Sequence, residues 1–436
     1  QKWANGIDDL AITSFLRFLK VLAELRSVTL DIVTVTSIAC PAYKSVTHPI
    51  DALYLGLGQT AAKEFAEWRV RCFSLARLDR EHLLFALHGV PLDLQGEPIG
   101  VSGDDYWTRE LAPADLPRIG DRSPFRQRGT YMIIGANGGL GGLLSRFLAE
   151  KYRAKLILVG RRPENSELCD ALSRLGAEVS YESVDLSDPA GVRAVLDKHP
   201  QIDGIVHSAL VLKDSALVNM SEESLMSVLL PKVHGTFNLL NALRHRRLDF
   251  VLFFSSIQSH IANAGQANYT AACACKDALA SVLNDVFLVN SKVINWGFWG
   301  SVGIVASDSY RERMTRLEIG SIEPAEGLQI VARFLGSPLE QIAVIKASDR
   351  ALERLNVRPH STGIVPAYDR AEPAVAHNEA LSTALDDYSR ARLHQTALRI
   401  RVVPQFEKLM KAISQIPYVA PIDKRDILSK WPDLKG

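Results

Sequence analysis

Two hydroxyl side chains stand at a spacing that suits proton transfer to a carbonyl oxygen. Ser256 ends the apolar run FVLFFSS, and Tyr269 follows thirteen residues later, at the start of the helical run YTAACACKDALASVLNDV. A serine at the carboxyl end of a strand and a tyrosine on the next helix can face one crevice. There Ser256 would hydrogen-bond the oxygen and Tyr269 would donate a proton to it. Each residue alone has a plainer interpretation, a turn for Ser256 and core packing for Tyr269.

A phenol with a pKa of about 10 is a weak acid and needs a nearby cation to serve as the proton donor. The serine and tyrosine resemble those of short-chain dehydrogenases, which ordinarily carry a lysine four residues after the tyrosine. Here that place holds Cys273, so we expect the cation to be Lys232, in the run LLPKVHGTFNLLNAL on the preceding helix. Lys276, one helical turn further, is predicted to be a surface residue. Cys273 and Cys275 diverge on a helix, which favours core packing over metal binding. The sequence predicts no metal site.

A glycine-rich loop predicts a nucleotide site. The run YMIIG leads into Gly135-Ala-Asn-Gly138-Gly139-Leu-Gly141, and the helical run LLSRFLAEKY follows. Glycines permit a tight turn and let the backbone approach a pyrophosphate at a helix N-terminus. An ordinary strand-to-helix turn is the alternative interpretation. The expected contacts in this loop are Gly135, Asn137, Gly138, Gly139, Leu140 and Gly141.

The next two runs point to the kind of dinucleotide. The second run ends in Gly160-Arg161-Arg162, where an acidic residue would hold the ribose 2′-hydroxyl of NADH. A guanidinium can instead grip the 2′-phosphate of NADPH, although a solvated basic turn would look the same. The end of the third run is where adenine would bind, with a plain helix N-cap as the alternative. The remaining expected cofactor contacts are Asp185, Leu186, Ser208, Lys232 and Tyr269.

Regular alternation of strand and helix patterns must position these residues. From Thr130 onward, short apolar or β-branched runs alternate with segments long enough for crossover helices. This order predicts an α/β fold with a doubly wound parallel Rossmann-type sheet. The predicted strands are 131–135, 155–160, 178–184, 203–209, 250–256, 292–297 and 342–346.

The flanking parts of the chain predict two further units. Residues 1–128 resemble a smaller, degenerate copy of the same plan, with helices over 11–26 and 55–68, strands over 30–39 and 73–78, and a hairpin and linker over 92–128. Its pattern Gly56-Leu-Gly58-Gln-Thr-Ala61 follows Pro49 and Asp51 and is predicted to serve helix packing. Residues 129–357 would form the catalytic unit. Residues 358–436 read as a linker and a short helical tail, with helices over 381–400 and 402–413, or as the start of a neighbouring domain.

Composition narrows the classes of partner and the cellular compartment that we expect. The chain has 436 residues, 47% hydrophobic and 23% charged, with a net charge of +1, which gives no reason to expect nucleic acid or an anionic membrane as partner. Five cysteines without C-x-x-C spacing favour a reducing cytoplasm. No run is long and apolar enough to span a bilayer, and the start QKWANGIDD lacks the order of a signal peptide. The first residue is not Met, so we expect a piece of a longer polypeptide.

The motifs together resemble a known family. PKVHGTFNL, VLFFSS, the tyrosine helix and VINWGFWG are similar to the ketoreductase region of modular polyketide synthases, within the short-chain dehydrogenase/reductase superfamily. An asparagine usually stands where this chain has Cys273. That cysteine and HSALVLKDSAL resemble the trans-acyltransferase type. The resemblance implies that residues 1–128 are a structural subdomain without cofactor.

The resemblance also implies an activity and partners. It would be NADPH-dependent reduction of a 3-ketoacyl thioester, carried on the phosphopantetheine arm of an acyl carrier protein, with neighbouring synthase domains in the same polypeptide. Three alternatives remain open: a catalytically silent scaffold, a free-standing reductase of small carbonyls, and a binding module.

Stereochemistry rests on two positions. Leu212-Lys213-Asp214 stands where B-type enzymes of the family carry Leu-Asp-Asp, and Phe253 stands where the opposite class has tryptophan. Both imply a D-configured 3-hydroxyl, although a loop aspartate is as often structural. The segment 298–320 suggests a lid over the acyl chain, in which Phe298 and Trp299 would contact substrate or lie in the core.

Overall fold

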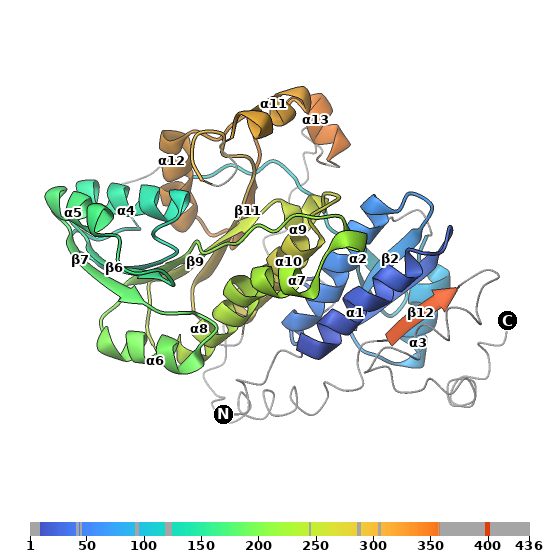
Figure 1. The fold of residues 1–436 in the computed structure, drawn as a ribbon. Coiled ribbons are helices and arrows are strands. Elements are labelled where there is room, and N and C mark those ends of the chain that lie inside the picture. The colour runs from blue at the N-terminus through green and yellow to red at the C-terminus, as the bar shows by residue number, and fades with distance from the viewer. Residues whose placement is uncertain are drawn as a thin grey trace.

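Two β-sheets joined by packed helices make up the part of the chain that the computed structural model describes (Figure 1). A seven-stranded sheet lies on one side and a five-stranded sheet on the other. The described residues are 9–40, 43, 46–91, 96–117, 124–243, 246–285, 289–303, 307–355, 357 and the strand 397–401.

The larger sheet has the strand order β11-β10-β9-β8-β5-β6-β7, and all its neighbouring strands are parallel. The order reverses between β5 and β8, and ligands of such sheets bind at that point, beyond the carboxyl ends of the strands. All seven predicted strands and the doubly wound fold are confirmed. The strands are β5 (Thr130–Ile134), β6 (Lys155–Gly160), β7 (Glu178–Ser183), β8 (Gly204–His207), β9 (Phe250–Ser256), β10 (Ser291–Trp296) and β11 (Gln341–Val344).

Helices cover both faces of this sheet. Helices α4, α5 and α12 pack on one face, and α6, α7, α8 and α10 on the other. Because side chains alternate along a strand, Phe253 of β9 packs in the layer of α10, whereas Phe254 packs in the opposite layer. The helices and short turns are α4 (Gly139–Tyr152), α5 (Ser166–Arg174), α6 (Pro189–Lys198), η3 (Leu217–Asn219), α7 (Glu222–Leu229), η4 (Leu230–His234), α8 (Gly235–Leu243), α9 (Gln258–Ile261), α10 (Ala267–Asp285), α11 (Asp308–Arg316), α12 (Pro324–Leu335) and α13 (Asp349–Arg354).

The smaller sheet has the order β12-β1-β2-β3-β4. Strands β1, β2 and β3 are parallel, and β3 and β4 form the predicted hairpin. The helices and strands predicted in residues 1–128 are therefore present, in a smaller version of the main plan. The elements are α1 (Asp9–Leu22), β1 (Thr29–Val35), η1 (Pro49–Asp51), α2 (Ala52–Glu64), β2 (Arg69–Leu75), α3 (Arg80–Leu84), η2 (Phe85–Gly89), β3 (Pro98–Ser102) and β4 (Asp105–Thr108).

The end of one predicted tail helix is a strand instead. Residues Ala397–Arg401 form β12, which pairs antiparallel with β1 from Thr29 to Val33. An edge strand such as β1 offers unpaired backbone groups to any extended segment, and the alternation Leu-Arg-Ile-Arg suits a strand. The helical prediction for 397–400 is therefore wrong. The rest of the predicted linker and tail lies outside the described residues.

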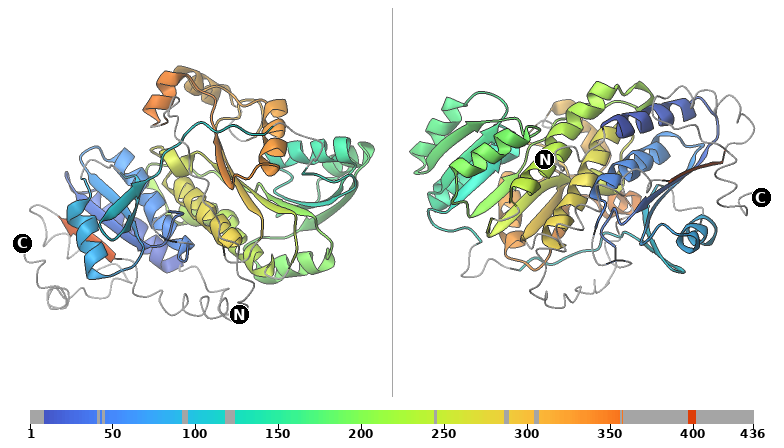
Figure 2. Two further views of the ribbon diagram at one scale, coloured as in Figure 1. Left: turned by 180° about the vertical axis from the view of Figure 1, so that it is seen from behind. Right: turned by 90° about the horizontal axis from the view of Figure 1, so that it is seen from below.

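Helices α2 and α10 join the two sheets (Figure 2). A Cβ at Gly56 of α2 would lie 2.5 Å from the Cα of Ala271 in α10, so the two helix backbones meet directly. The prediction that the Gly56 pattern serves helix packing is confirmed. Within the described ranges, no helix is both long and apolar enough to cross a membrane.

Candidate active site

A cavity of ≈ 800 Å³ opens at the carboxyl ends of the parallel strands, within the usual size range of small-molecule sites. Its walls come from the loop after β5, the ends of β6 to β10, the start of α10, and α11 and α13. Every expected cofactor contact except Lys232 lines this cavity.

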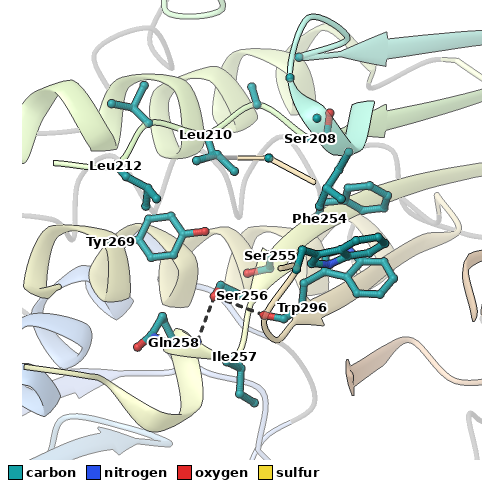
Figure 3. Close-up of a pocket in the computed structure, with 18 of the residues that line it drawn as sticks. Ser208, Leu210, Leu212, Phe254, Ser255, Ser256, Ile257, Gln258, Tyr269 and Trp296 are labelled. Carbon is teal, nitrogen blue, oxygen red and sulfur yellow. Dashed lines mark hydrogen bonds between the residues drawn. The ribbon is translucent and has the colours of Figure 1, made fainter. Parts of the chain in front are cut away.

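Ser256 and Tyr269 lie on one wall of the cavity, and Figure 3 shows the Tyr269 hydroxyl directed toward the end of β9. The two residues are 8% exposed each. Ser256 Oγ accepts the backbone N–H of Gln258 at 3.3 Å and lies 3.5 Å from the backbone oxygen of Trp296. The structure thus brings the two predicted hydroxyls together at the cavity surface.

Lys232 reaches Tyr269 from behind the cavity wall. It lies in η4, a wide π-helical turn between α7 and α8, where Pro231 has no N–H to continue an α-helical ladder. Lys232 is fully buried, and its Nζ lies 4.5 Å from the centroid of the Tyr269 ring and donates to Cys273 Sγ at 3.4 Å. Cys273 therefore contacts the lysine from the place usually held by asparagine.

The pKa values of Tyr269 and Lys232 depend on each other. Burial raises the pKa of the Tyr269 phenol, and the Lys232 ammonium lowers that pKa by less. Burial lowers the pKa of Lys232, but Cys273 and Tyr269 raise it by more, so that it lies above its ordinary value. An ammonium on Lys232 would therefore stabilise the phenolate that forms when Tyr269 gives up its proton.

The glycine loop forms a bare cradle at the N-terminus of α4. Gly135 adopts φ +86°, and Gly138 caps the helix. A Cβ at Gly141 would lie 2.5 Å from the Gly135 oxygen and 2.7 Å from Ser208 Oγ. Side chains are thus excluded where a pyrophosphate would need the backbone. The residues present fit a dinucleotide.

The arginine turn and the adenine position lie on the same cavity. Arg161 and Arg162 are exposed at the end of β6. Asp185 does not cap α6; its Oδ1 instead accepts the N–H and hydroxyl of Ser187, at 2.8 and 2.7 Å. The N-cap of α6 is Asp188. Because Arg161 and Arg162 are exposed at the cavity edge, their side chains can reach an anion bound there.

Of the four predicted substrate residues, two line the cavity and two do not. Phe298 and Trp299 line the cavity, and both are also largely buried. Asp214 accepts Gln266 Nε2 at 2.7 Å, and Gln266 lines the cavity although Asp214 does not. Phe253 does not reach the cavity, because strand alternation turns it into the α10 layer beside His207. Phe253 therefore cannot contact a substrate in this cavity directly.

Lys276 is not a surface residue, contrary to expectation. It is fully buried, because position 276 lies two helical turns from Tyr269 on the same inward face of α10. Cys273 and Cys275 are buried as well, and no group of His, Cys, Asp and Glu among the described residues could hold a metal ion.

Sequence analysis missed Tyr181 of β7. Its hydroxyl accepts Asn137 Nδ2 at 2.9 Å and donates to the Arg162 backbone oxygen at 2.8 Å. It thereby joins the glycine loop to the arginine turn. A tyrosine near the carboxyl end of the third predicted strand was the available signal, since that edge of a parallel sheet carries the ligand site.

Comparison with known proteins places this site in a family. Residues 129–301 match the family described as KR domain. Polyketide synthase PksN of Bacillus subtilis (strain 168) is 30% identical over 369 residues, which are 82% of this chain and 7% of that protein. Polyketide synthase ThaG of Burkholderia thailandensis is 34% identical over 378 residues, 84% of this chain and 6% of that protein. The chain thus spans a small part of the curated relatives it matches.

Solved structures agree with the fold. A ketoreductase domain from the bacillaene assembly line superposes with a TM-score of 0.68 at 23% identity, covering 79% of this chain and 85% of that one. PlmKR1, the ketoreductase from the first module of phoslactomycin biosynthesis in Streptomyces sp. HK803, gives 0.65 at 27% identity, covering 74% and 76%. The expected resemblance to polyketide synthase ketoreductases is confirmed, and the Bacillus relatives are consistent with the trans-acyltransferase type.

Proposed function

Since residues 129–301 belong to the KR domain family of polyketide synthases, we propose that this chain uses NADPH to reduce a 3-ketoacyl thioester to the 3-hydroxyacyl thioester. Reduction with a nicotinamide dinucleotide is the activity of the family. The choice of NADPH, the thioester and the residue roles are our proposal. The observation that carries it is Lys232 Nζ 4.5 Å from the Tyr269 ring, with Ser256 lining the same cavity as Tyr269.

Three side chains share the work at the carbonyl. Ser256 would hold the ketone oxygen by a hydrogen bond, and Tyr269 would deliver its proton to that oxygen as negative charge develops there. Lys232 would stabilise the phenolate that remains, from within the protein and without touching the substrate. The nicotinamide, when bound, supplies the hydride. Burial of Tyr269 and Lys232 strengthens their interaction by excluding water.

NADPH would be selected at the arginine turn. Arg161 and Arg162 lie exposed on the cavity edge at the end of β6, where a ribose 2′-substituent comes to rest in this fold. Two guanidinium groups favour a dianionic phosphate over a neutral hydroxyl. Gly135, Gly138 and Gly141 would hold the pyrophosphate.

The substrate would arrive on the phosphopantetheine arm of an acyl carrier protein, with synthase domains flanking this chain. Apolar residues on the cavity wall, among them Leu210 and Leu212, suit an acyl chain (Figure 3). We propose B-type stereochemistry on Asp214, whose bond to Gln266 ties the loop after β8 to the cavity. Phe253 could influence the face only through packing.

We also propose the division of labour along the chain. Residues 1–128 would be a structural subdomain that supports α10 through α2, and 129–357 would be the catalytic subdomain. Residues 358–436 would form a tail that returns to the structural subdomain at β12.

The test is reduction of a synthetic 3-ketoacyl thioester, followed by NADPH absorbance and product chromatography. Stoichiometric 3-hydroxyacyl product is expected. A wild-type protein that binds NADPH and yet turns over no thioester, free or carrier-bound, would instead be a silent scaffold.

A further inference from the structure

A second buried lysine lies behind the catalytic wall. Lys276 Nζ is 3.0 Å from the backbone oxygen of Phe254, 3.1 Å from that of His207 and 3.2 Å from His207 Nδ1. Lys276 and His207 are both 0% exposed. None of the three partners is a carboxylate. A fully buried lysine without a directly bound carboxylate is rare and calls for a physical account.

The contacts of Lys276 join the ends of two strands. The His207 oxygen is the last carbonyl before Ser208, and the Phe254 oxygen immediately precedes Ser255 and Ser256. One nitrogen atom therefore cross-links β8 and β9 where they enter the cavity. Ser208 Oγ in turn donates to the Ile134 oxygen at 2.8 Å, next to the glycine cradle.

The charge state follows from what surrounds the amine. The ionisable groups facing Lys276 are Lys232 from η4, His207 from β8, and Cys273 and Asp277 from α10. Two ammonium groups in this space would repel each other at low dielectric, with Asp277 already held by Ser259 and Asn295. Lys232 is the better placed to keep the charge, because its Nζ lies 4.5 Å from the Tyr269 ring centroid, whereas Lys276 Nζ lies 5.6 Å from that of Phe253.

A neutral amine satisfies the remaining geometry. An ammonium could donate to both carbonyls and to an unprotonated His207 Nδ1, and a neutral amine could donate to the carbonyls and accept a proton from Nδ1. Repulsion from Lys232 favours the neutral form, in which both side chains are uncharged. Burial, followed by repulsion from Lys232, lowers the pKa of Lys276 well below its usual value. The pKa of His207 is lowered too, by burial and then by the two lysines.

We propose that Lys276 is an uncharged positioning residue, which fixes Ser208 and Ser256 by tying β8 to β9 and leaves Lys232 as the cation beside Tyr269. The positioning of Ser256 for reduction rests on the proposed function. The charge state of Lys276 does not rest on the proposed function, and it can be measured without substrate.

The first experiment is unfolding by denaturant between pH 7 and 9 for the wild type and Lys276→Met. A lysine that is neutral when folded and protonated when unfolded makes the unfolded state bind one more proton, so stability rises with pH. The wild type should gain up to tenfold in its folding equilibrium constant per pH unit relative to Lys276→Met. The control Lys155→Met removes an exposed lysine and should follow the wild-type slope. Parallel slopes for the wild type and Lys276→Met would show a charged Lys276 and overturn the proposal.

The second experiment separates kcat from KM. Lys276→Met should lower kcat for a free 3-ketoacyl thioester at least tenfold with a smaller change in KM, because Ser256 loses its alignment. Lys276→Gln keeps an N–H donor and should recover part of kcat, and it replaces the methionine variant in both experiments if that variant does not fold. A kcat within twofold of wild type for both variants would remove the positioning role. An inactive wild type with the expected pH slope would instead fault the proposed function.

Discussion

Replacing Lys232 by methionine tests whether a charge inside the protein makes Tyr269 a usable acid. Methionine keeps the length of the buried side chain and removes only the ammonium, which lies 4.5 Å from the centroid of the tyrosine ring. With an effective dielectric constant of about 20, that separation corresponds to about 3.7 kcal/mol between a cation and the phenolate formed on proton transfer. We therefore expect kcat to fall by roughly two to three powers of ten.

The assay is NADPH oxidation by a 3-ketoacyl thioester at saturating cofactor, across pH 6 to 10. Burial raises the pKa of Tyr269 to about 12, and loss of the Lys232 ammonium raises it further, so Tyr269 stays protonated in both proteins across this range and the effect should appear as a lower kcat. Lys155→Met, far from the carboxyl ends of the strands, should behave as wild type. A Lys232→Met variant with kcat within tenfold of wild type, or one less damaged than Lys276→Met, would show that the cation is wrongly assigned.

Two further changes test the cofactor and the facial choice. At least one of Arg161→Ala and Arg162→Ala should weaken NADPH binding by about 1.5–3 kcal/mol and leave NADH binding nearly unaffected. Titration of each variant with both cofactors measures this. An unchanged NADPH affinity in both variants would refute the arginine hypothesis. The unmodified protein should yield the D-3-hydroxyl product. Asp214→Ala, which releases Gln266, should reduce the excess of that product, since tenfold selectivity needs only about 1.4 kcal/mol. Mainly L-alcohol from the wild type, measured by chiral chromatography, would refute the B-type assignment.

The parallel sheet and the placement of Ser256 and Tyr269 could be predicted because their signals are local. The central strands are largely continuous apolar runs, as expected for strands buried on both faces, whereas β7 at the sheet edge mixes polar and apolar residues. The carboxyl ends of parallel strands share one edge, so Ser256 and the loop at Gly135 had to meet there. Lys232 could be predicted only through the family resemblance, since its π-helical turn has no distinct sequence pattern.

Other features of the structure could not be predicted from the sequence. In FVLFFSS every residue but the serines is apolar, so nothing in the run tells which phenylalanine faces the cavity. Lys276 was predicted to be exposed on the basis of its charge, although its spacing of seven from Tyr269 places it on the same helix face. Strand β12 pairs with the edge of β1, which is distant in sequence, so the short alternation in residues 397–401 alone could not identify its partner.

The most direct test of the account is Tyr269→Phe, which removes the proton donor and keeps the ring that packs against Lys232. NADPH affinity, measured by fluorescence titration, and turnover of a 3-ketoacyl thioester are compared with wild type. The account predicts an active wild type and a variant whose NADPH affinity is unchanged while reduction falls by about 10²-fold or more. A Tyr269→Phe protein that still reduces the thioester at close to the wild-type rate would contradict it.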